Sequence, residues 1–182
     1  ADATPEGYFF GNLRVDNALD RADMEIRLHE NDPEMAKKCL EEAERNMPSE
    51  VVNVSNAKHG EAMKQRSDLM RQMVKFHSLR IMLVLQGNET KTLGDKDIDA
   101  ITENMGQMLY FADFFGDGLR TVGAPIKDIQ EKLAPLPFET QKKIFNRACN
   151  KNFWADRSLF EQHGKFVEDY MKDCFGFFSK EE

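Results

Sequence analysis

Apolar residues recur every three or four positions along most of the chain, which is the period of an α-helix with one buried face. In the first such segment, Val15, Leu19, Ala22, Ile26 and His29 follow one another at alternating spacings of four and three. This pattern predicts a long helix over about residues 8–30. The alternating β-branched pattern of a strand is limited to a short stretch at 51–54. The sequence therefore predicts an all-α protein.

The same period predicts further helices, and their boundaries carry ordinary stop and start signals. Asp32-Pro33 is typical of a helix start, because proline fits the first turn, and Gly87-Asn88 is typical of a helix end. Residues 49–60 are compatible with a loop or with an early start of the following helix. The further predicted helices lie at 33–47, 61–86, 95–115, about 126–133, 139–149 and 156–178.

Four of these helices are long, namely 8–30, 61–86, 95–115 and 156–178. Long helices joined by short turns pack antiparallel to one another. We therefore expect an antiparallel helical bundle of four long helices with two or three short ones. With 182 residues and 21.0 kDa the chain suits a single domain. In this domain, residues 1–7 are expected to be an extended N-terminal segment and 179–182 a charged tail.

The charge balance narrows the range of partners. The formal net charge is −7, which disfavours binding to phosphate backbones and to anionic membrane surfaces. The longest apolar runs fall far short of the ~20 residues of a membrane span. The chain starts with Ala-Asp rather than Met, which fits removal of a signal peptide, removal of the initiator Met alone, or a piece of a membrane receptor. We therefore expect export to the periplasm or the outside of the cell, with a cytoplasmic protein as the alternative.

Aromatic residues crowd two related stretches, YFFGNLR at 8–14 and YFADFFGDGLR at 110–120. If the start of the first helix meets the end of the helix at 95–115, these side chains form one aromatic pole of the bundle. Such a pole either seals the bundle or opens as a pocket for a small ligand or a partner helix. Its arginines would then face an anionic group. The candidate ligand-binding residues are Phe9, Phe10, Arg14, Phe111, Phe114, Phe115 and Arg120.

Three of the four histidines lie on apolar helix faces, and bundles build metal and haem sites from imidazoles on facing helices. The candidate metal set is Glu25, His29, His77 and His163, with Glu25 one turn before His29. The alternative is structural histidines at the edge of the core, each satisfied by a hydrogen bond. Paired Glu-x-x-His motifs and HExxH do not occur in the sequence, so the structural interpretation is favoured.

Motifs for catalysis are not found. The sequence has no GxSxG, no P-loop and no GxGxxG. We expect a non-enzymatic, exported binding or sensing module that recognises a small ligand or partner helix at the aromatic pole, without a cofactor. The alternatives are a haem- or transition-metal-binding bundle and a protein-interaction adaptor. A homodimer is compatible with the wide apolar helix faces.

Overall fold

The structure, a computed structural model, describes residues 5–28, 33–47, 61–86, 93–114, 127–154 and 157–175. These residues form helices joined by turns, with no strand among them, so the all-α prediction is confirmed. A shorter helix occupies residues 127–133. The other helices are α1 (Pro5–Leu28), α2 (Pro33–Asn46), α4 (Glu61–Gln86), α5 (Asp95–Phe114), α7 (Phe138–Ala148) and α8 (Arg157–Phe175).

The helix boundaries follow the sequence signals closely, with one correction at the N-terminus. Helix α1 begins at Pro5, so residues 5–7 are helical and not part of an extended segment. The reason is that proline, which is pre-organised for the first turn, serves as a helix start here as Pro33 does in α2. Residues 49–60, for which the sequence leaves open a loop or an early helix start, and the charged tail at 179–182 lie outside the described residues.

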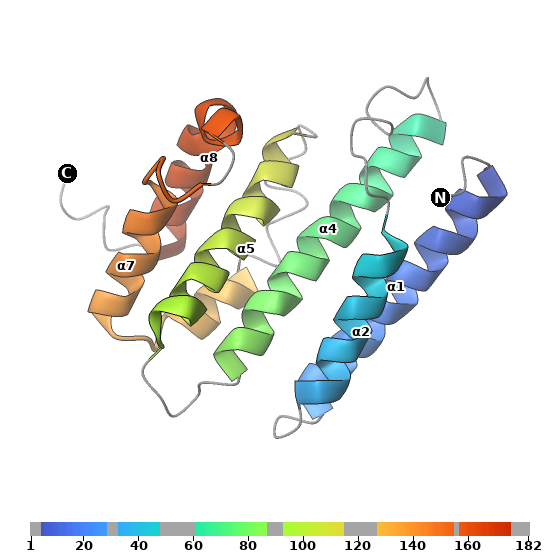
Figure 1. The fold of residues 1–182 in the computed structure, drawn as a ribbon, viewed down its shortest axis with the longest axis horizontal. Helices are drawn as coiled ribbons and strands as arrows, with labels where there is room; N and C mark the ends of the chain where they lie inside the picture. The colour runs from blue at the N-terminus through green and yellow to red at the C-terminus, as the bar shows by residue number, and fades with distance from the viewer. Residues whose placement is uncertain are drawn as a thin grey trace.

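The helices stand side by side in a row (Figure 1). The hairpin of α1 and α2 forms one end of the row, α4 and α5 form the middle, and α7 and α8 form the other end. Helices α1 and α2 run in opposite directions, as do α4 and α5. Helix α4 contacts α1 and α2 on one side and α5 on the other, so it separates the α1–α2 hairpin from the rest of the molecule.

Two hydrophobic clusters lie on opposite faces of α4. Met70, Val74 and Ile81 of α4 belong to the larger cluster, whereas Phe76 and Leu79 belong to the smaller one. At 100° per residue these two sets project about 180° apart. The larger cluster also draws on α5, α7, α8 and the helix at 127–133, and includes Ile98, Ile101, Met105, Met108, Leu109, Ile129, Leu133, Ile144, Val167 and Met171.

The smaller cluster joins the α1–α2 hairpin to α4. Phe76 is 4 % exposed and Leu79 is 5 % exposed. The stripe predicted for α1 is confirmed at each of its described positions, and the cluster consists of Val15, Ala18, Leu19, Ala22, Ile26, Ala36, Cys39, Leu40, Ala43, Phe76 and Leu79. The three- and four-residue period along α4 passes through Met70, Val74, His77 and Ile81 and predicts one apolar face. The second face, with Phe76 and Leu79, was not predicted.

A close contact fixes the turn after α7 against α5. A Cβ atom added to Gly106 would lie 2.7 Å from Cη2 of Trp154. The indole therefore packs directly on the backbone of α5, where no larger residue than glycine fits without displacing the ring. Its Nε1 donates a hydrogen bond to the carbonyl oxygen of Ala148 at 3.0 Å.

Candidate binding groove between α1 and α4

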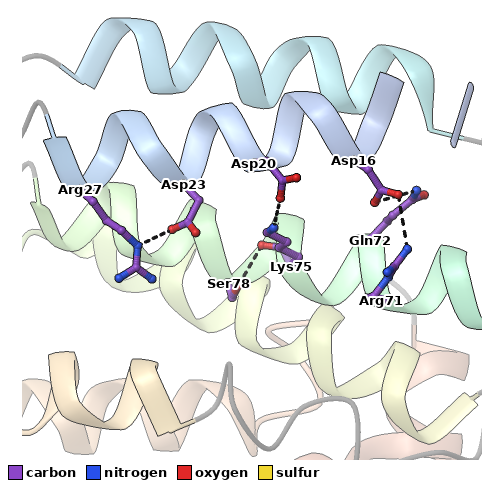
Figure 2. Close-up of polar contacts among 8 residues, drawn as sticks. All are labelled: Asp16, Asp20, Asp23, Arg27, Arg71, Gln72, Lys75 and Ser78. Atoms are coloured by element: carbon purple, nitrogen blue, oxygen red, sulfur yellow. Dashed lines mark hydrogen bonds and ion pairs between the residues drawn. The ribbon is translucent and has the colours of Figure 1, made fainter. Parts of the chain in front are cut away.

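Polar side chains line the boundary between α1 and α4, above the smaller hydrophobic cluster. Asp16, Asp20 and Asp23 on α1 are spaced four and three residues apart, which places them along one side of the helix. Figure 2 shows these carboxylates along α4, where Arg71 meets Asp16 and Lys75 meets Asp20. The third carboxylate, Asp23, is met by Arg27 of α1. We call this row of contacts the α1–α4 seam.

The contacts of the seam cross from one helix to the other at two levels. Arg71 Nη2 lies 3.4 Å from Asp16 Oδ2, and Lys75 pairs with Asp20. Gln72 Nε2 adds a hydrogen bond to the second oxygen of Asp16 at 3.3 Å. The seam therefore aligns α1 along α4 through charge pairs and one amide.

Near the C-terminal end of α1, the contact of the seam joins two residues of α1 itself. Arg27 Nε donates to Asp23 Oδ1 at 2.8 Å, one helical turn away. This hydrogen bond, together with the negative charge of Asp23, raises the pKa of Arg27. On α4, Ser78 Oγ donates to the carbonyl oxygen of Lys75 at 2.8 Å. The Ser78 hydroxyl is thereby held against its own helix rather than against α1.

The seam contributes less to stability than the apolar cluster beneath it. The Arg71 and Arg27 side chains are 57 % and 62 % exposed, and exposed ion pairs are worth only about 0–1 kcal/mol each. Burial of a side chain such as Phe76 contributes several-fold more, roughly 1.5–3 kcal/mol. The charged groups of the seam can therefore exchange partners at little cost, while the apolar cluster holds the hairpin in place.

An open groove lies where the seam meets the helix at 127–133. Its volume is about 230 Å³. Its lining combines charged side chains and the Ser78 hydroxyl with apolar residues, of which Val74, Leu79 and Ile129 are buried. The lining residues are Asp23, Arg27, Arg71, Val74, Lys75, Ser78, Leu79, Met82, Asp128 and Ile129. We call it the α1–α4 groove.

The aromatic pole predicted from the sequence lies largely outside what the structure describes. The side chains of Phe9, Phe10, Phe111 and Phe114 are outside the described residues, and so are Phe115 and Arg120 entirely. The start of α1 and the end of α5 both lie at the upper side of the row of helices in Figure 1, with α4 between them. Arg14 is exposed and lines a separate hollow beside α2. The pole therefore stays a prediction.

The predicted metal ligands occupy different parts of the fold. Glu25 is a half-buried residue of α1, and His29 lies outside the described residues. The His163 ring of α8 stands edge-on to Tyr110 of α5, with 4.7 Å between ring centroids. No three His, Cys, Asp or Glu side chains in the described part of the chain are grouped so that they could hold a metal ion.

His77 takes part in a buried polar contact between α4 and α5. Its Nδ1 lies 2.8 Å from Asn104 Oδ1. Asn104 Nδ2 donates in turn to the carbonyl oxygen of Ala100 at 2.7 Å, which fixes the orientation of the amide. Because the amide oxygen only accepts, Nδ1 carries the imidazole proton. Burial lowers the pKa of His77 to about 4, against the raising effect of the Asn104 hydrogen bond.

The two cysteines whose side chains the structure describes are free thiols with raised pKa values. Burial raises the pKa of Cys39. Burial, aided by the charge of Glu168, raises the pKa of Cys149 to about 11. A thiol is nucleophilic only as the thiolate, so neither has the depressed pKa of a catalytic cysteine.

Comparison with known protein families, with curated proteins and with solved structures finds no match for this chain. None of the described helices combines the length and the apolar character that crossing a membrane requires. The α1–α4 groove was not predicted from the sequence. The sequence does contain a row of aspartates in α1 and a pair of cations of similar spacing in α4. This pattern indicates a shared polar boundary only when the two helices are known to be neighbours.

Proposed function

We propose that this protein is a non-enzymatic binding module that holds an amphipathic helix of a partner protein in the α1–α4 groove. The observation that carries the proposal is a groove whose lining combines apolar side chains, including Leu79 and Met82, with charged side chains from three helices. Helix-in-groove recognition uses this arrangement, in which apolar anchors enter the groove and polar flanks meet its rim.

The size and shape of the groove favour a side chain of a partner segment over a whole small ligand. Small-molecule sites usually enclose about 300–1,000 Å³, whereas this groove has about 230 Å³ and is open to solvent. A volume of this kind accepts one or two anchoring side chains. The rest of the partner would lie along the seam, over α1 and α4.

The charges favour a basic partner. The charged groups of the seam are already paired within the chain, so they add little preference for either sign of charge in a partner. The net charge of −7 therefore sets the preference for a cationic partner. An acidic protein attracts a cationic segment from a distance and accelerates its association. Asp20, whose side chain is 67 % exposed, can then exchange Lys75 for a lysine or arginine of the partner.

The test uses a synthetic 18-residue peptide of leucine and lysine that is patterned as an amphipathic helix, a length of about five turns. Its counterpart has glutamate in place of lysine. We expect the basic peptide, titrated into isotopically labelled protein, to shift the backbone amide resonances of Asp23, Ser78 and Met82. The acidic peptide is expected to bind at least about tenfold more weakly, because its charge has the sign of the protein.

A pair of variants separates the groove from the rest of the surface. Met82→Lys places a charge in the groove lining and should abolish the shifts. Met35→Lys is the matched control, because Met35 is an exposed methionine of α2 and is not part of the groove lining. The proposal fails if both variants bind the basic peptide equally, or if the shifts map to another surface.

A further inference from the structure

The outward face of α1 carries a row of exposed apolar side chains. Leu13, Met24 and Leu28 are 46 %, 55 % and 68 % exposed. At 100° per residue they project on the side opposite the buried face, and Asn17 lies between them on the same line. Among the described residues only Met35 and Phe138 are other large hydrophobic residues with comparable exposure. We call Leu13, Asn17, Met24 and Leu28 the α1 ridge.

The α1 ridge lies on the outer side of the helix pair at one end of the molecule. The α1–α2 hairpin stands at the end of the row of helices (Figure 1), and none of the described helices covers the ridge. The solvent-facing side of a surface helix usually carries polar and charged residues. Aligned apolar residues on an outer face instead indicate a surface that packs against another molecule.

We propose that the α1 ridge is the interface of a homodimer, in which α1 of two copies pack antiparallel about a two-fold axis. The spacing of the ridge is self-complementary. With the axis between Asp20 and Arg21, Leu13 of one copy lies at the level of Leu28 of the other, and Asn17 at the level of Met24. Each pair then occurs twice, as a two-fold interface requires.

The charges at the axis also suit a second copy. Asp20 and Arg21 flank the ridge at its midpoint and are 67 % and 59 % exposed. Two copies therefore bring two carboxylates and two guanidinium groups to the axis, which is a neutral set. Each guanidinium is long enough to reach a carboxylate of the other copy. Within one copy Asp20 pairs with Lys75 and Arg21 pairs with Glu42. Exposed pairs of this kind can be exchanged at little cost, so two copies can share these groups across the axis.

A hollow beside the α1 ridge can accommodate side chains of α1 from the second copy. It has a volume of about 420 Å³ and lies between α1 and α2, with Arg14, Asn17, Met24 and Glu42 in its lining. From Leu13 to Leu28 the ridge extends over 16 residues, or roughly 24 Å. A single pair of helices of this length makes a small interface, the class to which weak and reversible complexes belong. We therefore expect a dissociation constant on the order of micromolar or above.

Sedimentation analysis of the whole chain over a range of concentrations tests the proposal. We expect a reversible monomer–dimer equilibrium in the native protein. The double variant Leu13→Gln/Leu28→Gln should raise the dissociation constant by about tenfold or more, because four leucine side chains leave the interface. Both leucines are exposed in the monomer, so the variant should keep its helical circular dichroism. Phe138→Gln is the control, because Phe138 is 49 % exposed on α7, and it should dimerise normally.

A charge exchange at the axis tests the geometry itself. Arg21→Asp gives a homodimer four carboxylates at the axis, and Asp20→Arg gives it four guanidinium groups, so each variant alone should be monomeric. Mixed together, the two variants should form a one-to-one heterodimer.

Three results overturn the proposal: a native chain that stays monomeric at every concentration, which would leave the ridge to a different protein; a dimer unaffected by the double variant; or two exchange variants that do not combine. Met82→Lys, in the α1–α4 groove, should leave the dimer intact, so the two proposals fail independently.

Discussion

His77 should make the protein less stable in mild acid, and replacing it should remove this part of the acid sensitivity. The imidazole is 7 % exposed between α4 and α5, and burial lowers its pKa to about 4. In the unfolded chain the pKa of histidine is about 6.5. Between these values the unfolded chain binds a proton that the folded protein excludes, so the contribution of His77 to stability falls as the pH falls from about 6.5 to about 4.

The size of the effect follows from the difference between the two pKa values. A difference of about 2.5 units corresponds to a total loss of roughly 3 kcal/mol, of which about 2 kcal/mol is lost by pH 5. Because whole domains have only about 5–15 kcal/mol of stability, this loss is measurable. The variant His77→Gln has no titrating group, and its side-chain amide can still donate to Asn104 Oδ1.

The assay is urea unfolding of the native chain and of His77→Gln at about pH 7 and about pH 5. We expect the native chain to lose about 2 kcal/mol more than the variant between these pH values. Other titrating groups are common to both proteins, so their effects cancel in the difference. Thr102→Val, which alters a buried polar residue of α5, serves as a control and should keep the native pH dependence. Equal acid losses in the native chain and in His77→Gln would refute the assignment of a depressed pKa to a buried imidazole.

Two further substitutions test the packing. Phe76→Ala should lower the free energy of unfolding by about 3–5 kcal/mol, because Phe76 joins α4 to the α1–α2 hairpin. A loss below about 1 kcal/mol, measured by urea unfolding, would mean that α4 has only one core-facing side. Gly106→Ala should cost about 1–3 kcal/mol, because its Cβ would lie 2.7 Å from the Trp154 ring. Trp154 is the single tryptophan, so its fluorescence should change as the ring is displaced, and unchanged emission with unchanged stability would contradict the contact.

Most of the secondary structure could be predicted from the sequence, because helix formation depends on neighbours three and four residues apart. The stripe of Val15, Leu19, Ala22 and Ile26 predicted α1 and its buried face, and all four are buried. Proline at position 33 marked the start of α2. The start of α1 was placed too late because Pro5 was not recognised as a first-turn residue of the helix.

The second apolar face of α4 could not be assigned in the same way. Phe76 and Leu79 interrupt the stripe of Val74 and Ile81 with further apolar residues, and a helix that is apolar on two sides has no single periodic signal. Only the packing of the hairpin on one side and of α5 on the other divides these residues between two clusters.

The α1–α4 groove, too, could not be predicted from the local pattern of the sequence. Asp16 and Arg71 are 55 residues apart in the sequence, and nothing in the local pattern of either helix names the other as its partner. The same holds for His77, which the sequence offered as a metal ligand and which the packing of α4 on α5 pairs with Asn104. The sequence by itself determined where helices form and which stripe most of them bury, because those are local properties of the chain. Which helices become neighbours, and therefore which charges meet in a groove, depends on contacts between distant segments that only the folded structure establishes.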